Sequence, residues 1–211
     1  MRQNRWTAWL MALGVWASIG FSPPPRSTVD IVAGTIERGG RPAAGAVVYL
    51  LRQPAAARDA VEANADTAVL DQRSLSFVPG VLAVKPGTTV EFLNSDGVLH
   101  NVFSPGRVVG VGEPFDLGTY SRGEMRRRTF TELGAHTILC NVHPEMVAYI
   151  VSVPAEHRAV TDSDGRFTMG DVPSGSYRLQ VWYPQSPEFA MDVRVSPDLK
   201  PLAISLEPAA E

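Results

Sequence analysis

The sequence is poor in the residues that usually reveal a site at once, with one cysteine and four histidines among 211 residues. A single cysteine cannot form a disulfide within the chain, so an exported thiol needs another role to protect it. Charged residues make up only 19% against 45% apolar residues, which is typical of a chain that buries a core. No long segment has a strong helical period, and 18 glycines and 17 prolines favour many short strands joined by turns.

The first 20 residues have the pattern of a secretory signal. Arg2 and Arg5 precede an uncharged apolar segment from Trp6 to Phe21, which is shorter than the ~20 apolar residues of a membrane-spanning helix. We therefore expect residues 1–20 to be removed and the chain to be periplasmic or secreted. An uncleaved segment is the alternative, and only then would the chain be attached to a membrane.

The remaining chain is mildly acidic. Removal of residues 1–20 takes away two of the 19 basic residues and none of the 22 acidic ones, so 17 basic residues face 22 acidic ones, a balance of −5. This charge gives no reason to expect nucleic acid as a partner.

Two separated parts of the chain predict one β-sandwich. Residues 29–53 contain two expected strands, Val29–Glu37 and Ala46–Leu51, joined by a Gly/Pro turn. A lone hairpin is marginally stable in water, whereas residues 157–209 supply further strands and an Asp-Gly hairpin signal. We predict that 29–53 and 157–209 form one discontinuous domain, and that the Ala-rich residues 54–69 are a linker with a short helix.

Residues 70–153 predict a second β-domain inserted into the first. Val90 and Phe92 fall on one strand face and Glu91 on the other. Several such short strands at regular spacing indicate a small antiparallel sandwich or barrel. In the later part of the chain, Leu179 and Val181 likewise share a face, and Trp182 lies on the opposite one.

The only cysteine lies in a segment of potential metal donors, residues 140–146, with the sequence C-N-V-H-P-E-M. Cys140, His143 and Met146 offer a thiolate, an imidazole and a thioether, which suit copper in both of its common oxidation states. A site with two histidines, one cysteine and a weak methionine needs one more imidazole, and His100 is available from another expected strand.

Each of these residues also has a plainer interpretation. Cys140 alone could be a buried structural thiol or a nucleophile with a histidine as its base, although no third orienting group is evident. Met146 could fill core space. His136 lies on the same strand face as Cys140, but we expect a core or edge histidine there, and His157 lies in a segment expected to be solvated.

Two resemblances join these observations. Residues 77–103, F-V-P-G-V-L-A-V-K-P-G-T-T-V-E-F-L-N-S-D-G-V-L-H-N-V-F, followed by the 140–146 segment, resemble a cupredoxin. The short Cys-x₂-His-x₂-Met loop is most similar to amicyanin, since plastocyanin has a longer one, and the layout resembles methylamine-utilisation-like exported proteins. The resemblance implies one type 1 copper with His100, Cys140 and His143 as equatorial ligands and Met146 as the axial ligand. It also makes Asn101 a candidate for hydrogen bonding to the sulfur.

The flanking parts resemble a carboxypeptidase regulatory-like (transthyretin-like) sandwich. The motifs are V-A-G-T-I-E-R-G-G-R-P-A-A-G-A-V-V-Y-L in the first part and T-D-S-D-G-R-F-T-M-G-D-V-P-S-G-S-Y-R-L-Q-V in the second. This resemblance implies a fold and a binding or spacing role, not an active site. The expected fold class is therefore all-β, with a Greek-key cupredoxin sandwich and a second sandwich.

The function expected from these resemblances is transfer of single electrons by blue copper between redox proteins such as a cytochrome or a dehydrogenase. With two of four histidines already used, a second catalytic copper in the same chain is not expected, so the chain is interpreted as a carrier and not an enzyme. Two alternatives stay open: a protein that binds or delivers copper without redox turnover, and a metal-free binding module at the cell surface.

Overall fold

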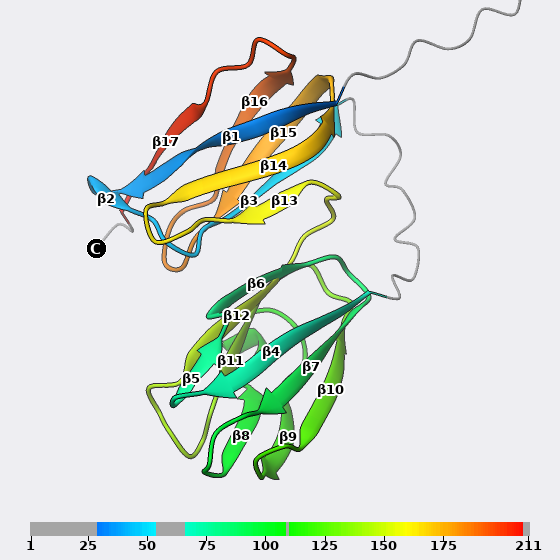
Figure 1. Ribbon diagram of the computed structural model, residues 1–211, viewed down its shortest axis with the longest axis vertical. Coiled ribbons are helices and arrows are strands. Elements are labelled where there is room, and N and C mark those ends of the chain that lie inside the picture. The colour runs from blue at the N-terminus through cyan, green and yellow to red at the C-terminus, as the bar shows by residue number, and fades with distance from the viewer. Residues whose placement is uncertain (1–28, 54–65, 109, 209–211) are drawn as a thin grey trace, which may run out of the picture.

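The computed structural model describes residues 29–53, 66–108 and 110–208 (Figure 1). These residues form β-strands and one short 3-10 helix, η1 (Gly106–Val108). Within them, no helix has the length and apolarity needed to cross a membrane. The expected signal, residues 1–20, and the greater part of the expected linker, residues 54–65, lie outside the described residues.

Strands β4 to β12 form two sheets that enclose one core, which we call the inner sandwich. One sheet has the order β10-β7-β4-β5, and the other has the order β6-β12-β11-β8-β9. Val90 and Phe92 are fully buried in the core between them. The strands are β4 (Thr67–Arg73), β5 (Ser76–Val78), β6 (Val81–Val84), β7 (Thr88–Asn94), β8 (His100–Ser104), β9 (Phe115–Tyr120), β10 (Met125–Phe130), β11 (Gly134–Leu139) and β12 (Val147–Ser152).

The strands before and after this block form the outer sandwich. One sheet has the order β14-β1-β17, with β2 paired to β1, and the other has the order β13-β3-β15-β16. Ile36, Leu50 and Leu179 are buried in a core separate from that of the inner sandwich. The strands are β1 (Val29–Arg38), β2 (Arg41–Pro42), β3 (Val47–Gln53), β13 (Arg158–Val160), β14 (Arg166–Pro173), β15 (Gly175–Trp182), β16 (Phe189–Val195) and β17 (Leu202–Leu206).

The alternation of side chains along the strands agrees with the sequence pattern. In β7 every second residue is buried, so Val90 and Phe92 face the core while Glu91 lies on the other face, where it pairs with Arg127 at 2.6 Å. The all-β class with two sandwiches is thus confirmed.

The expectation of an antiparallel sandwich or barrel for residues 70–153 was wrong in part, because not all neighbouring strands there are antiparallel. Three strand pairs are parallel: β4 with β7, β6 with β12, and β1 with β17. The two strands of each pair are neighbours in the sheet but are separated in the sequence by other strands. The intervening chain returns to the starting end of the first strand, so that the second strand can run in the same direction. Strand β4 begins at Thr67, which pairs with Thr89, so residues 67–69 of the expected linker belong to a strand.

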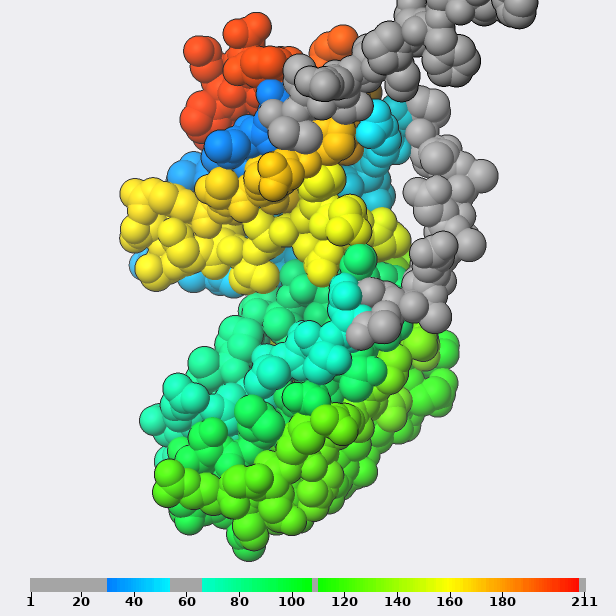
Figure 2. All heavy atoms as spheres, turned by 45° about the vertical axis from the view of Figure 1, so that its right-hand side comes forward, coloured from blue at the N-terminus to red at the C-terminus, as the bar shows by residue number. Residues whose placement is uncertain are grey.

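The two sandwiches are in contact with each other (Figure 2), and an apolar layer lies between them. The layer joins the sheet faces that point away from the two cores. Trp182 lies against Tyr149 of β12, with ring centroids 5.3 Å apart. The buried members of the apolar layer are Val47 of β3 together with Val151, Val153 and Ala155. Partly buried side chains pack around them: Tyr49, Leu51, Val81, Ala83 and Ala135.

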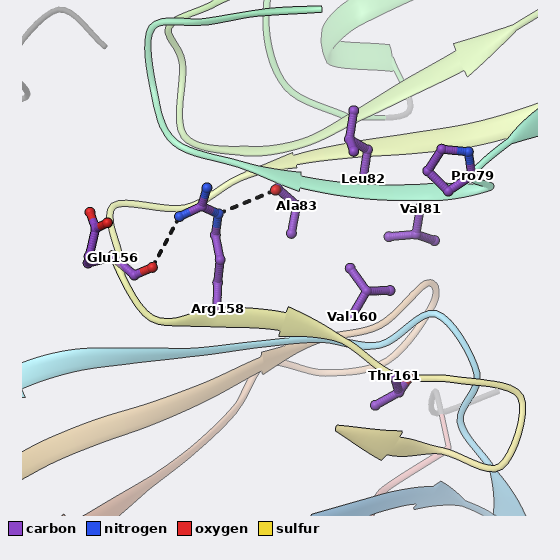
Figure 3. Close-up of a pocket in the computed structure, with 8 residues that line it drawn as sticks. All are labelled: Pro79, Val81, Leu82, Ala83, Glu156, Arg158, Val160 and Thr161. Atoms are coloured by element: carbon purple, nitrogen blue, oxygen red, sulfur yellow. Dashed lines mark hydrogen bonds between the residues drawn. The ribbon is translucent and has the colours of Figure 1, made fainter. Parts of the chain in front are cut away.

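A second contact holds the edge of this interface together (Figure 3). Arg158 of β13 donates to the carbonyl oxygen of Ala83 in β6 at 3.3 Å, and to the carbonyl oxygens of Ala155 and Glu156 at 3.1 and 3.2 Å. The guanidinium thereby links the edge strand of one sheet to the edge strand of the other across a cleft of about 700 Å³. The inner sandwich is therefore fixed to the outer one by apolar packing and by a polar contact.

Candidate metal centre

The donor residues come from neighbouring strands that end at one edge of the inner sandwich. Strands β11 and β12 are antiparallel neighbours, with Leu139 opposite Val147, so the loop 140–146 reverses the chain over a short distance. Strand β8 lies on the other side of β11 and begins at His100. The gap of 40 residues between His100 and Cys140 is therefore closed by the sheet topology.

Three donor atoms converge at this edge. The Sγ atom of Cys140 lies 4.0 Å from Nδ1 of His100 and 4.0 Å from Nδ1 of His143, and the two nitrogens are 3.0 Å apart. Within the described part of the chain, these are the residues that form a group of potential metal ligands. His100 and Cys140 are buried, whereas His143 is partly exposed.

The distances fit a single bound ion. A point equidistant from the three atoms lies about 2.2 Å from each, close to the ~2.0–2.1 Å and ~2.3 Å of metal–imidazole and metal–thiolate bonds. The two imidazole nitrogens also lie within hydrogen-bond distance of each other, with the donor set by the tautomer. The separations of the three atoms are therefore compatible with coordination of one metal ion.

Met146 closes the same loop. Its backbone N–H donates to the carbonyl of His143 at 3.0 Å, which tightens the turn. Its side chain is 1% exposed and belongs to the core cluster that contains Cys140. The thioether is thus buried beside the thiol, as both the ligand and the core-filling interpretations require.

Asp96 contacts and orients His100, and the sequence analysis does not identify this residue. Its Oδ2 atom lies 2.8 Å from Nε2 of His100. A proton on Nε2 leaves the Nδ1 lone pair free for a metal. The signal in the sequence is a carboxylate four residues before a candidate histidine, within N-S-D-G-V-L-H.

The Asp96 carboxylate is itself held by the backbone. It accepts hydrogen bonds from the N–H groups of Ser74 at 2.6 Å and Leu75 at 2.9 Å, and both residues have positive φ angles, 53° and 56°. Partial burial acts to raise the pKa of Asp96, but the hydrogen bonds from Leu75, His100 and Ser74 outweigh it and lower the pKa. The carboxylate is therefore charged at neutral pH.

Asn101 holds β8 against the metal loop. Its backbone N–H points to Cys140 Sγ at 3.5 Å, so the main chain, not the amide side chain, contacts the sulfur. The side chain accepts from the N–H of Asn141 at 3.3 Å and donates to Asp116 at 2.6 Å. Asn101 thus connects β8 to the loop that follows β11 and to β9.

The other two histidines lie outside this group. His136 is buried against Phe130, with Nε2 3.0 Å from the carbonyl oxygen of Glu132. Burial lowers its pKa, although the nearby Glu132 acts in the opposite direction. His157 is half-buried, and its carbonyl oxygen accepts from the N–H of Leu50. Neither ring joins the donor cluster.

Comparison with known proteins agrees with this geometry. The family of copper-binding proteins of the plastocyanin/azurin type matches residues 63–153. Plastocyanin from Ulva pertusa is 32% identical over 78 residues, which span 35% of this chain and 80% of that plastocyanin. The chain belongs to the plastocyanin/azurin family. Copper is therefore the cofactor of this cupredoxin.

Two further similarities cover most of the related protein but less than half of this chain. Plastocyanin from Ulva arasakii is 31% identical over 78 residues, or 35% of this cupredoxin and 80% of its own chain. A solved structure of a reduced amicyanin variant is 26% identical and covers 44% of this chain and 87% of its own, with a TM-score of 0.39. The family match ends at residue 153.

The donor set agrees with the copper of this family. One thiolate, two imidazoles and one thioether are softer than the oxygen ligands preferred by magnesium or calcium. The buried sulfur also receives the backbone N–H of Asn101, a type of contact that tunes a cysteine ligand when a metal is bound. The chemistry of the residues present is thus compatible with the cofactor implied by the family.

Proposed function

We propose that this protein is an exported type 1 copper carrier that transfers one electron at a time between redox partners. Its proposed ligands are His100, Cys140 and His143 in the equatorial plane and Met146 in the axial position. The observation that carries the proposal is the triangle of 4.0, 4.0 and 3.0 Å formed by one sulfur and two imidazole nitrogens.

Each residue has a distinct task in this proposal. Cys140 supplies a charged soft donor, and buried His100 is held by Asp96 in the tautomer that presents Nδ1. Met146 supplies a weak donor from the apolar side. When bound, copper supplies the one-electron couple, and a ligand set fixed by neighbouring strands of one sheet needs little rearrangement between oxidation states.

His143 is the proposed point of electron entry or exit at this end. It is the partly exposed member of the cluster, whereas His100 is 0% exposed. Exposed apolar side chains of Val98, Leu99 and Val142 occur in the neighbouring loops, with exposed fractions of 47, 53 and 46%. A partner protein such as a cytochrome or dehydrogenase could exclude water here while its own redox centre approaches His143.

We also propose two domains, with residues 70–153 as the cupredoxin and residues 29–53 and 157–209 as a discontinuous carboxypeptidase regulatory-like domain. Separate cores and separate sheets support this division. An exported location is proposed from the pattern in residues 1–20. The proposal does not include an enzymatic activity, because the candidate site uses two of the four histidines and no second metal-ligand group occurs in the described residues.

The test is addition of Cu(II) to the purified protein. We expect one copper per chain and an intense visible thiolate-to-copper band, which is lost in Cys140→Ala and shifted in Met146→Gln. His157→Gln is the matched control because it removes a histidine outside the donor group. Reversible one-electron cycling and transfer to cytochrome c are the results expected of a carrier.

Other results would assign a different function. Stoichiometric copper that passes to an apo-acceptor without reversible cycling would indicate delivery. Failure to bind copper at all, with intact β-structure, would indicate a metal-free binding module and would overturn the proposal.

A further inference from the structure

A second cleft opens at the interface of the two sandwiches, on the side of β11 and β12. Its volume is about 740 Å³, within the range of about 300–1,000 Å³ that is typical of small-molecule sites. Tyr149 and Leu139 line it from the inner sandwich, and Trp182, Tyr183 and Ser186 line it from the outer one. The walls are therefore aromatic and aliphatic, and residues from both sandwiches are needed to form them.

Ser186 adds a polar group to the wall of this largely apolar cleft. The Oγ atom of Ser186 is buried and has no hydrogen-bond partner among the described residues, although it can both donate and accept. Its loop is well fixed, since the Ser186 N–H donates to the carbonyl of Tyr183 at 3.2 Å and Arg38 donates to the carbonyl of Gln185 at 2.8 Å. A buried hydroxyl left without a partner is costly, so a ligand oxygen would be favoured there.

The cleft also lies next to the candidate metal centre. Leu139 faces the cleft, whereas Cys140, the next residue, faces the inner core, because successive side chains of a strand point to opposite sides. A molecule seated against Leu139 is thus separated from the Cys140 sulfur by a single peptide unit and the cysteine side chain. Few covalent bonds connect the two sites.

We propose that this interdomain cleft binds a planar aromatic ring with hydroxyl or carbonyl oxygens, of the hydroquinone and quinone class. The ring packs against Tyr149, Trp182 and Tyr183, and one ring oxygen bonds to Ser186 Oγ. In this proposal the bound hydroquinone donates one electron to the oxidised protein. This part of the proposal rests on the proposed copper function.

The redox step balances with the hydroquinone as the reductant. The hydroquinone would lose one electron and one proton and become a semiquinone. The electron would pass by way of Leu139 and Cys140 to Cu(II) held by the proposed ligands, giving Cu(I), and the proton would go to water at the mouth of the cleft. Two semiquinones then disproportionate to one quinone and one hydroquinone. No further oxidant or reductant is needed.

The first experiment measures binding without any redox step. Trimethyl-p-benzoquinone is titrated into the copper-free full chain, and binding is followed by equilibrium dialysis. Val147→Trp, a substitution at a residue that lines the cleft and is 41% exposed, should weaken binding at least about tenfold. Ser186→Ala should weaken it between about twofold and tenfold, as expected for one hydrogen bond. Val69→Trp, at a residue of β4 that is 44% exposed, is the matched control and should bind as the wild type does.

The second experiment measures reduction of the copper-loaded chain by trimethylhydroquinone. We expect the rate to saturate with hydroquinone concentration and to fall in Val147→Trp, while reduction by hexaammineruthenium(II), which has no ring to bind, is unchanged. Absence of quinone binding, or equal binding by Val147→Trp and Val69→Trp, would overturn the site. Quinone binding without a visible copper band would instead reject the proposed copper function and leave the binding site standing.

Discussion

The carboxylate of Asp96 lies 2.8 Å from Nε2 of His100, on the ring edge opposite the nitrogen that faces Cys140 and His143. A buried imidazole is thus held between a negative charge on one side and the donor cluster on the other. In the proposed copper site, this arrangement would make His100 a stronger donor and favour the more positive oxidation state of the copper.

The Asp96→Asn variant tests this contact. The neutral amide removes the negative charge while keeping an oxygen that can accept from the backbone. We expect the reduction potential to rise and the affinity for Cu(II) to fall about 10- to 100-fold, as measured by voltammetry and competitive metal titration. Glu91→Gln, which removes a carboxylate on β7, should leave both quantities unchanged.

Asn101 provides a prediction about folding stability. The buried Asn101 side chain bonds to the N–H of Asn141 and to Asp116, which both belong to exposed residues, so Asn101→Ala removes two hydrogen bonds at once. The free energy of unfolding of the copper-free protein should fall by about 1–3 kcal/mol in urea denaturation. An unchanged midpoint would show that the amide does not hold β8 to the loop.

Trp182 provides a prediction about coupling between the sandwiches. Truncation of a buried tryptophan lowers the free energy of unfolding by about 3–5 kcal/mol. Trp182 is only partly buried, so Trp182→Ala should lower it by about 2 kcal/mol. We expect the single calorimetric unfolding transition of the wild type to separate into two, because the contact with Tyr149 is lost. Gln180→Ala, on the same face of β15, should keep one transition.

His136 makes stability depend on pH. Burial lowers its pKa in the folded chain, so the unfolded chain binds a proton at higher pH than the folded one. As the pH falls below the unfolded value of about 6.5, the free energy of unfolding should decrease until the folded pKa is passed. In His136→Gln this loss should be smaller than in His157→Gln when the copper-free proteins are compared by denaturation at several pH values.

Much of the fold could be predicted because strand alternation is a local property. Val90 and Phe92 face the core as their spacing indicates. Cys140 and His143 lie close to His100, while their role as ligands stays a prediction. The parallel pairs were missed, since alternation is the same in parallel and antiparallel strands.

Two features depend on contacts between distant parts of the chain, which the spacing of residues in the sequence does not predict. Asp96 reaches His100 only because the turn at Ser74 and Leu75 supplies backbone N–H groups to its carboxylate. Trp182 was correctly placed on the face away from the outer core, but alternation alone does not say that a second sandwich covers that face.

The short connection between β12 and β13 limits the orientation of the inner sandwich relative to the outer one. Only residues 153–157 separate these strands, and Val153 and Ala155 within them are buried in the layer between the sandwiches. The inner sandwich therefore cannot swivel freely on a tether. If the outer sandwich is attached to a surface, the angle of that attachment also sets the direction in which His143 points.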